Sequence, residues 1–187
     1  MFLRPFIKRY SIFIFLLIMG ITQGCASKYH VKAPDYAGYE GEINQHTRLI
    51  RAERDQIFEF ITQEKTFQTL CPDHTIFTHK TPPPYQVGTQ VHTKINHIFK
   101  LEWNTQVEEI IHSQKIRLRF LDGFFAGGTE LWEFEEEGDA VRVTHTIVVQ
   151  PKSLRKIAWL LKARRKHDEI VESVLDNLKE EAEKPLQ

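Results

Sequence analysis

Residues 140–150 read AVRVTHTIVVQ and residues 154–183 read LRKIAWLLKARRKHDEIVESVLDNLKEEAE, and these two neighbouring segments decide the fold. The first alternates apolar and polar residues, which is typical of a strand with one buried face. The second contains no glycine or proline, and at about 1.5 Å per residue it predicts a helix on the order of 45 Å long. Pro151 ends the strand and Ser153 can cap the helix. A strand therefore leads directly into one long C-terminal helix.

The sequence upstream alternates in the same way, with glycine-containing turns between the runs. Besides 140–150, we predict strands over Thr47–Ala52, Thr75–His79, Val87–His97, Leu101–Ile111, Lys115–Leu121 and Thr129–Glu136. Apolar residues at helical spacing predict two short helices, over Arg54–Gln63 and Thr66–Leu70. Alternation of this kind predicts an antiparallel sheet with one dry face and one wet face.

The order of these elements predicts how the sheet closes. One strand, two short helices, about six antiparallel strands and a long helix suggest a curved sheet wrapped around that helix, an α+β architecture. The residues that point to a family are Ile50–Phe58, Gly88, Gly123–Phe125, Gly128–Phe134, Arg142–Ile147 and Leu175–Glu183. Over roughly Gln45–Glu183 the chain resembles the START-like, Bet v 1-like superfamily (SRPBCC), which includes bacterial polyketide cyclase/dehydrase-like proteins. The resemblance implies a helix-grip fold with a cavity between helix and sheet, but fold does not decide function.

The N-terminal sequence has the features of an export signal. Basic residues without an acid precede the apolar run Ile12–Ile21, which is shorter than the roughly 20 residues of a spanning helix. The Gly24-Cys25 junction resembles the lipobox of bacterial lipoproteins, in which the signal is cleaved before a cysteine that carries lipid. An uncleaved N-terminal anchor is the alternative. We expect a signal peptide over residues 1–24, a lipidated Cys25 and tether over 25–44, and a START-like domain over 45–187.

Both alternatives tie the domain to a membrane outside the cytoplasm. We expect the protein in the bacterial cell envelope. If the host has two membranes, the resemblance to lipoproteins implies the periplasmic side of the outer membrane, because Ala26, and not an aspartate, follows the cysteine. The expected partners are this membrane, reached through Cys25, and a hydrophobic small molecule. The chain is expected to act as a monomer.

Composition excludes several classes of protein. Lys and Arg total 25, as do Asp and Glu, and loss of the basic signal leaves the remainder mildly acidic, which argues against a nucleic-acid-binding protein. With Cys25 lipidated, Cys71 is the only other cysteine, which excludes an intramolecular disulfide and paired-cysteine zinc sites. Phosphate-loop, dinucleotide, zinc-protease and nucleophile-elbow motifs are absent. We predict no cofactor and no metal, although a metal site assembled across the fold stays open.

Aromatic residues on the inward side of the strands are the candidate wall of a cavity. These are Trp103, Phe120, Trp132 and Phe134, which would equally serve as core. Phe124 and Phe125 lie in a glycine-flanked hairpin, where two exposed rings are unfavourable. They would either cover the cavity mouth or contact a membrane or partner.

The long helix carries a polar break in its apolar stripe. Ile157, Leu160 and Leu161 precede the break, and Val171, Val174, Leu175 and Leu178 follow it. Arg164, His167 and Asp168 occupy the middle, where Arg164 could bind a carboxylate or phosphate head group with Asp168 holding it. Alternatively the helix bows away from the sheet and Arg164 and Asp168 form a solvated pair.

Two further polar residues interrupt apolar strand faces. His145 lies between Val143 and Ile147, as an interior residue, a ligand contact or a proton-transfer group. Glu109 falls on the inward side of its strand, so either a bulge turns it outward or it meets a partner. A Glu109–His145 pair would be an acid/base couple for a cyclase or dehydratase-like reaction.

The segment Lys152–His167 contains seven Lys or Arg residues and no acid. It is either a solvated helix face or a contact for anionic lipid head groups. The function we predict is a membrane-anchored, extracytoplasmic protein that binds a hydrophobic or amphipathic molecule. A cyclase-like enzyme and an envelope interaction module with a filled cavity are the alternatives.

Overall fold

The computed structural model describes residues 36, 38–96, 100–151 and 154–185. The predicted signal peptide and Cys25 lie outside these residues. The elements are β1 (Glu42–Ile50), α1 (Arg54–Thr62), α2 (Glu64–Leu70), β2 (Thr75–His79), β3 (Gln90–Asn96), β4 (Lys100–Ile111), β5 (Lys115–Phe120), β6 (Thr129–Glu137), β7 (Ala140–Val149), α3 (Leu154–Ala158), the π-helical turn η2 (Trp159–Ala163) and α4 (Arg164–Ala182). The helices in this described part are not long and apolar enough for any of them to cross a membrane.

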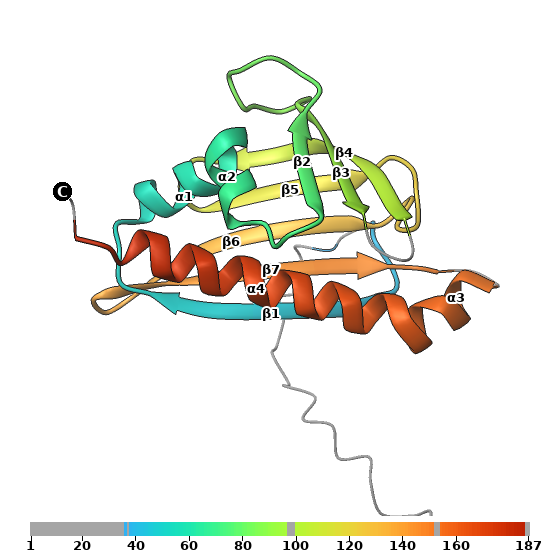
Figure 1. Cartoon of the computed structure of the whole chain (residues 1–187). Helices are drawn as coiled ribbons and strands as arrows, with labels where there is room; N and C mark the ends of the chain where they lie inside the picture. The colour runs from blue at the N-terminus through green and yellow to red at the C-terminus, as the bar shows by residue number, and fades with distance from the viewer. Residues whose placement is uncertain (1–35, 37, 97–99, 152–153, 186–187) are drawn as a thin grey trace, which may run out of the picture. The chain divides into compact units, whose positions relative to one another are not determined.

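The strands form one antiparallel sheet in the order β1-β7-β6-β5-β4-β3-β2. β1, the first strand, pairs with β7, the last, from Glu42 opposite Val149 to Ile50 opposite Val141. Figure 1 shows α4 running along β7 and β1, with α1 and α2 beside its C-terminal half. The predicted α+β helix-grip fold is confirmed.

The main core lies between α4, the two short helices and the inner face of the sheet. Val171, Val174, Leu175 and Leu178 of α4 are buried there, as the stripe predicted. They pack with a cluster that includes Ile57 of α1 and other buried residues of the sheet.

The N-terminal part of the apolar stripe was predicted wrongly. Ile157, Leu160 and Leu161 are 56%, 57% and 74% exposed, whereas Trp159 is fully buried. A π-helical turn contains one more residue per turn than an α-helix, so it rotates the preceding residues around the helix axis. Because η2 inserts such a turn before α4, Trp159 takes the inward position that a regular helix would give to Leu160.

β1 begins at Glu42, five residues before the predicted strand and inside the predicted tether. Apolar alternation missed this start because the inner face of β1 is mostly polar. Asn44, His46 and Arg48 point toward α4, while Ile43 and Leu49, on the outer face, are 49% and 44% exposed. Before Ile50, the inner face of β1 is thus polar where the inner face of its one neighbour, β7, is mostly apolar.

A β-bulge in β4 changes which side chains face inward. The register between β4 and β5 shifts between Val107 and Glu109, so Glu109 pairs with the outward-facing Arg117. Glu109 then lies on the outer face, 3.2 Å from Lys115 Nζ and 3.3 Å from Arg117 Nη1. Of the two alternatives left open by the sequence, the bulge is correct. Regular alternation would also place Ile111 on the inward side with Val107, but it is 42% exposed.

Candidate functional site

A cavity of about 100 Å³ lies between the inner face of the sheet and α4. Apolar and aromatic side chains from α2, the strands and α4 make up most of its lining. Of the residues proposed from sequence, the structure brings together Trp103, Phe120, Phe125, Trp132, His145 and His167 around this cavity.

Three proposed residues lie elsewhere. Phe134 is buried in the main core, in edge-to-face contact with Phe58 at 5.8 Å between ring centroids. Phe124 packs on Phe125 and Trp159 and does not contribute to the lining. Arg164, the first residue of α4, is exposed and also does not line the cavity.

The hairpin after β5 folds over one end of the cavity. The Phe125 ring is 5% exposed and lies 5.1 Å from the rings of both Trp103 and Phe120. It also lies 5.9 Å from the ring of Trp159. Gly123 permits this close approach, because its φ is +71° and an added Cβ would lie 2.4 Å from the Glu102 carbonyl oxygen. An aromatic cluster therefore closes this end.

The cavity has a polar region formed by Glu130, His145 and His167. Glu130 Oε1 accepts a hydrogen bond from Trp132 Nε1 at 2.9 Å and lies 3.2 Å from His145 Nε2. Glu130 was not among the site residues predicted from the sequence. Its alternation with Trp132 and Phe134 was a usable signal, since it puts Glu130 on the same inward face.

Two residues that line the cavity, His167 and Tyr85, have pKa values shifted from their usual ranges. Burial, followed by the nearby imidazoles of His145 and His46, holds the pKa of His167 well below its usual range. Burial and then the charge of Glu130 raise the pKa of the cavity residue Tyr85. Neutral side chains are therefore favoured at both positions at neutral pH, which suits a site for a mostly apolar ligand.

The proposed acid/base couple does not form. Glu109 is on the outer face of the sheet and His145 on the inner face, where its neighbouring carboxylate is Glu130. His145 is 3% exposed, and its Nδ1 is buried without a hydrogen-bond partner in the described part of the chain. Imidazole and carboxylate chemistry is thus present in the cavity, but with a different carboxylate.

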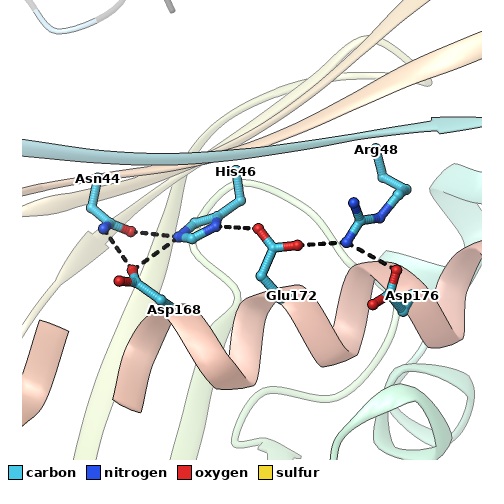
Figure 2. Close-up of polar contacts among 6 residues, drawn as sticks. All are labelled: Asn44, His46, Arg48, Asp168, Glu172 and Asp176. Carbon is cyan, nitrogen blue, oxygen red and sulfur yellow. Dashed lines mark hydrogen bonds and ion pairs between the residues drawn. The ribbon is translucent and has the colours of Figure 1, made fainter. Parts of the chain in front are cut away.

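A ladder of polar contacts joins β1 to α4 next to the cavity (Figure 2). Asp168 accepts a hydrogen bond from Asn44 at 2.7 Å and lies 3.1 Å from His46 Nε2, so it pairs with β1 and not with Arg164. Farther along α4, Arg48 bridges Glu172 at 2.5 Å and Asp176 at 2.9 Å.

Glu172 is the centre of this ladder. Partial burial raises the pKa of its carboxyl, but hydrogen bonds from His46 and Arg48 outweigh that effect and hold the pKa below its usual value. Glu172 is therefore ionised at neutral pH, which keeps the contacts with β1 in place.

Comparison with known proteins supports the fold alone. No family model matches the sequence, and no curated protein matches it significantly. Solved structures are similar: the protein TTHA0849 from Thermus thermophilus has a TM-score of 0.64 at 16% identity, over 75% of this chain and 97% of that one. The ginseng major latex-like protein 151 from Panax ginseng has a TM-score of 0.63 at 12% identity, over 76% and 98%. The KanY protein has a TM-score of 0.63 at 17% identity, over 77% and 99%.

Proposed function

We propose that the protein binds a hydrophobic or amphipathic small molecule and holds or transfers it beside a membrane. The observation that carries this proposal is the cavity between α4 and the sheet, apolar over most of its lining and polar at Glu130, His145 and His167. Apolar walls with a few placed polar groups are typical of small-molecule sites. A ligand would put its apolar body among the aromatic rings and a polar group near the histidines.

The size of the cavity limits what it holds without a rearrangement. Its volume of about 100 Å³ is below the roughly 300–1,000 Å³ of pockets for drug-sized ligands. A compact aromatic compound or the end of an acyl or isoprenoid chain suits this volume. A larger ligand requires the hairpin with Phe124 and Phe125 to move outward, and we propose that this hairpin gates access.

This proposal is tested by native mass spectrometry on residues 32–187, which form one compact unit. Produced in the native host, this domain is expected to retain an apolar or amphipathic molecule that extraction then identifies. Thr93→Trp, which puts an indole into the cavity, is expected to lower its occupancy at least tenfold, with folding checked by circular dichroism. Thr78→Trp, on the exposed side of β2, is the matched control.

The proposal that the cavity binds a ligand is contradicted if the wild-type domain is empty and also fails to bind fatty acids, isoprenoids and aromatic compounds. Equal occupancy in the Thr93→Trp variant would place the ligand elsewhere on the surface.

The membrane part of the proposal is supported by the surface of α3 and η2. Ile157, Leu160 and Leu161 are all more than half exposed, on a segment whose charged residues are all basic. An apolar strip flanked by Lys and Arg suits insertion among anionic lipid head groups. Together with lipidation of Cys25, this surface would hold the cavity next to a bilayer of the bacterial envelope.

Replacing Leu160 and Leu161 together by serine is expected to weaken binding of residues 32–187 to anionic phospholipid vesicles tenfold or more. The reason is that burying one leucine contributes roughly 1.5–3 kcal/mol when complete, and these side chains would insert in part. Vesicle flotation measures the change. Leu49→Ser, an exposed leucine on the outer face of β1, should leave binding unchanged; a similar loss in both would refute a specific docking face.

An enzyme remains the second candidate, because His145 Nε2 lies 3.2 Å from Glu130 Oε1 inside the cavity. This pair could move a proton in a cyclase or dehydratase-like reaction. His145→Ala separates the two functions. An enzyme would lose pH-dependent turnover while keeping its ligand, whereas a carrier would lose affinity alone.

A further inference from the structure

Several acceptor atoms converge where β1 runs beside the N-terminal half of α4 (Figure 2). His46 Nδ1 lies 2.6 Å from Glu172 Oε1, so this nitrogen carries the proton that the carboxylate accepts. His46 Nε2 lies 2.8 Å from Asn44 Oδ1 and 3.1 Å from Asp168 Oδ1. The Asn44 amide is oriented by its own Nδ2, which donates to Asp168 at 2.7 Å. Nε2 thus faces two oxygen acceptors, an arrangement that is favourable only with a proton or a metal ion between them.

The surroundings of His167 favour a metal ion over a proton at this position. Its ring centroid lies 6.0 Å from that of His46, and its Nδ1 is buried without a hydrogen-bond partner in the described residues. A proton on His46 leaves the His167 ring as it is. A metal ion bound by both rings and Asp168 gives that ring a partner, and ligand atoms of the three residues already lie within 4.8 Å of one another.

We propose that His46, His167 and Asp168 bind a zinc ion. Two imidazole nitrogens and one carboxylate oxygen are ligands that zinc prefers, and three protein ligands leave a fourth position open. Tetrahedral zinc with bonds of about 2.1 Å puts its ligand atoms roughly 3.4 Å apart, so separations of up to 4.8 Å need to close by at most about 1.4 Å.

The residues around the three ligands are also those of a zinc site. A zinc-bound histidine typically donates its other N–H to a carboxylate, which fixes the orientation of the ring. Glu172 accepts this hydrogen bond from His46 and is itself held by Arg48 at 2.5 Å. His167 also lines the cavity, so an ion at this position adjoins the polar region of the ligand site. The inference does not depend on any ligand in that cavity.

The test uses the full chain, purified in detergent, stripped with a chelator and titrated with zinc chloride by calorimetry. One zinc ion per chain with a dissociation constant in the micromolar range or below is expected. His167→Gln and Asp168→Asn should each weaken binding at least tenfold, and Glu172→Gln about 10–100-fold, as outer-shell partners of zinc ligands do. His92→Gln, a histidine of β3 hydrogen-bonded to Asn104, is the matched control and should keep full affinity.

Cobalt substitution in the wild-type chain gives a readout that needs no variant. Strong visible absorption, characteristic of tetrahedral cobalt, supports the site, and a weak six-coordinate spectrum overturns it. The proposal is likewise overturned if the wild type binds no zinc at 100 µM, or if His167→Gln and Asp168→Asn bind it undiminished. A second proton on His46 would then satisfy the cluster.

Discussion

Replacing Trp159 with alanine is expected to lower the free energy of unfolding by about 3–5 kcal/mol, as large-to-small changes at fully buried aromatic residues do. Trp159 is 0% exposed and packs with Phe125 in the aromatic cluster that closes the cavity. Its Nε1 also donates to Glu42 Oε2 at 2.8 Å, which joins η2 to the start of β1. The variant therefore loses both a buried side chain and the hydrogen bond that joins η2 to β1.

Urea unfolding followed by circular dichroism measures this change. Leu160→Ala is the matched control, and because its side chain is 57% exposed it should cost about 0.5 kcal/mol or less. A regular α-helix would reverse the two results, so equal or inverted effects would disprove the π-helical turn. Trp159→Phe retains a ring, and its smaller cost combines the lost hydrogen bond, about 1 kcal/mol, with the loss of part of the buried indole.

Cys71 is expected to react with iodoacetamide about fifty-fold more slowly in the folded chain than in urea. Burial raises the pKa of its thiol to about 12. Compared with an ordinary thiol pKa of 9.0, this reduces the reactive thiolate at pH 8 about a thousand-fold. The higher basicity of that thiolate recovers roughly a factor of twenty, because nucleophilicity rises with pKa.

Peptide mass spectrometry after timed alkylation at pH 8 gives the Cys71 rate separately from Cys25. Because Cys71 lines the cavity, a bound ligand should slow the reaction further. Similar rates in folded and denatured protein would show that the segment after α2 opens readily and that this wall of the cavity is not closed.

Sequence periodicity was reliable wherever the packing partner of an element is apolar. The inner face of β7 shows this, since Val141, Val143 and Ile147 are buried as the alternation predicted, although Thr144 and Thr146 on the predicted wet face are buried as well. The C-terminal half of the long helix behaves in the same way. In both elements the face that packs inward is the one with the apolar residues, so residue type alone identifies it.

Periodicity gave wrong faces at three places. At two of them an extra residue shifts the register of the strand or helix, and at the third the packing partner is polar. The bulge in β4 turned Glu109 outward, and η2 moved Leu160 to the surface. Neither segment contains a glycine or proline that would have indicated the irregularity from sequence. The inner face of β1 is polar because α4 presents acids to it, and that complement lies more than a hundred residues away in sequence.

The candidate site followed the same division. Alternation alone predicted Trp103, Phe120 and Trp132 of its aromatic lining and the inward position of His145. It did not predict the lining residues Phe67, Phe77 and Tyr85. The grouping of His46, His167 and Asp168 could not, because it needs the pairing of β1 with β7 and the rotation of α4. Residue type shows which face is dry, but the register of distant elements determines which polar groups meet.

The pairing of β1 with β7 also sets the order in which the domain can fold. The first strand has its neighbour only after the last strand and α4 have been made, since Ile50 pairs with Val141 and Arg48 with Asp176 of the helix. Contacts this distant in sequence form late and slowly. With this topology the sheet is completed only after β7 has been made, so the first strand waits without a strand partner until most of the chain is available.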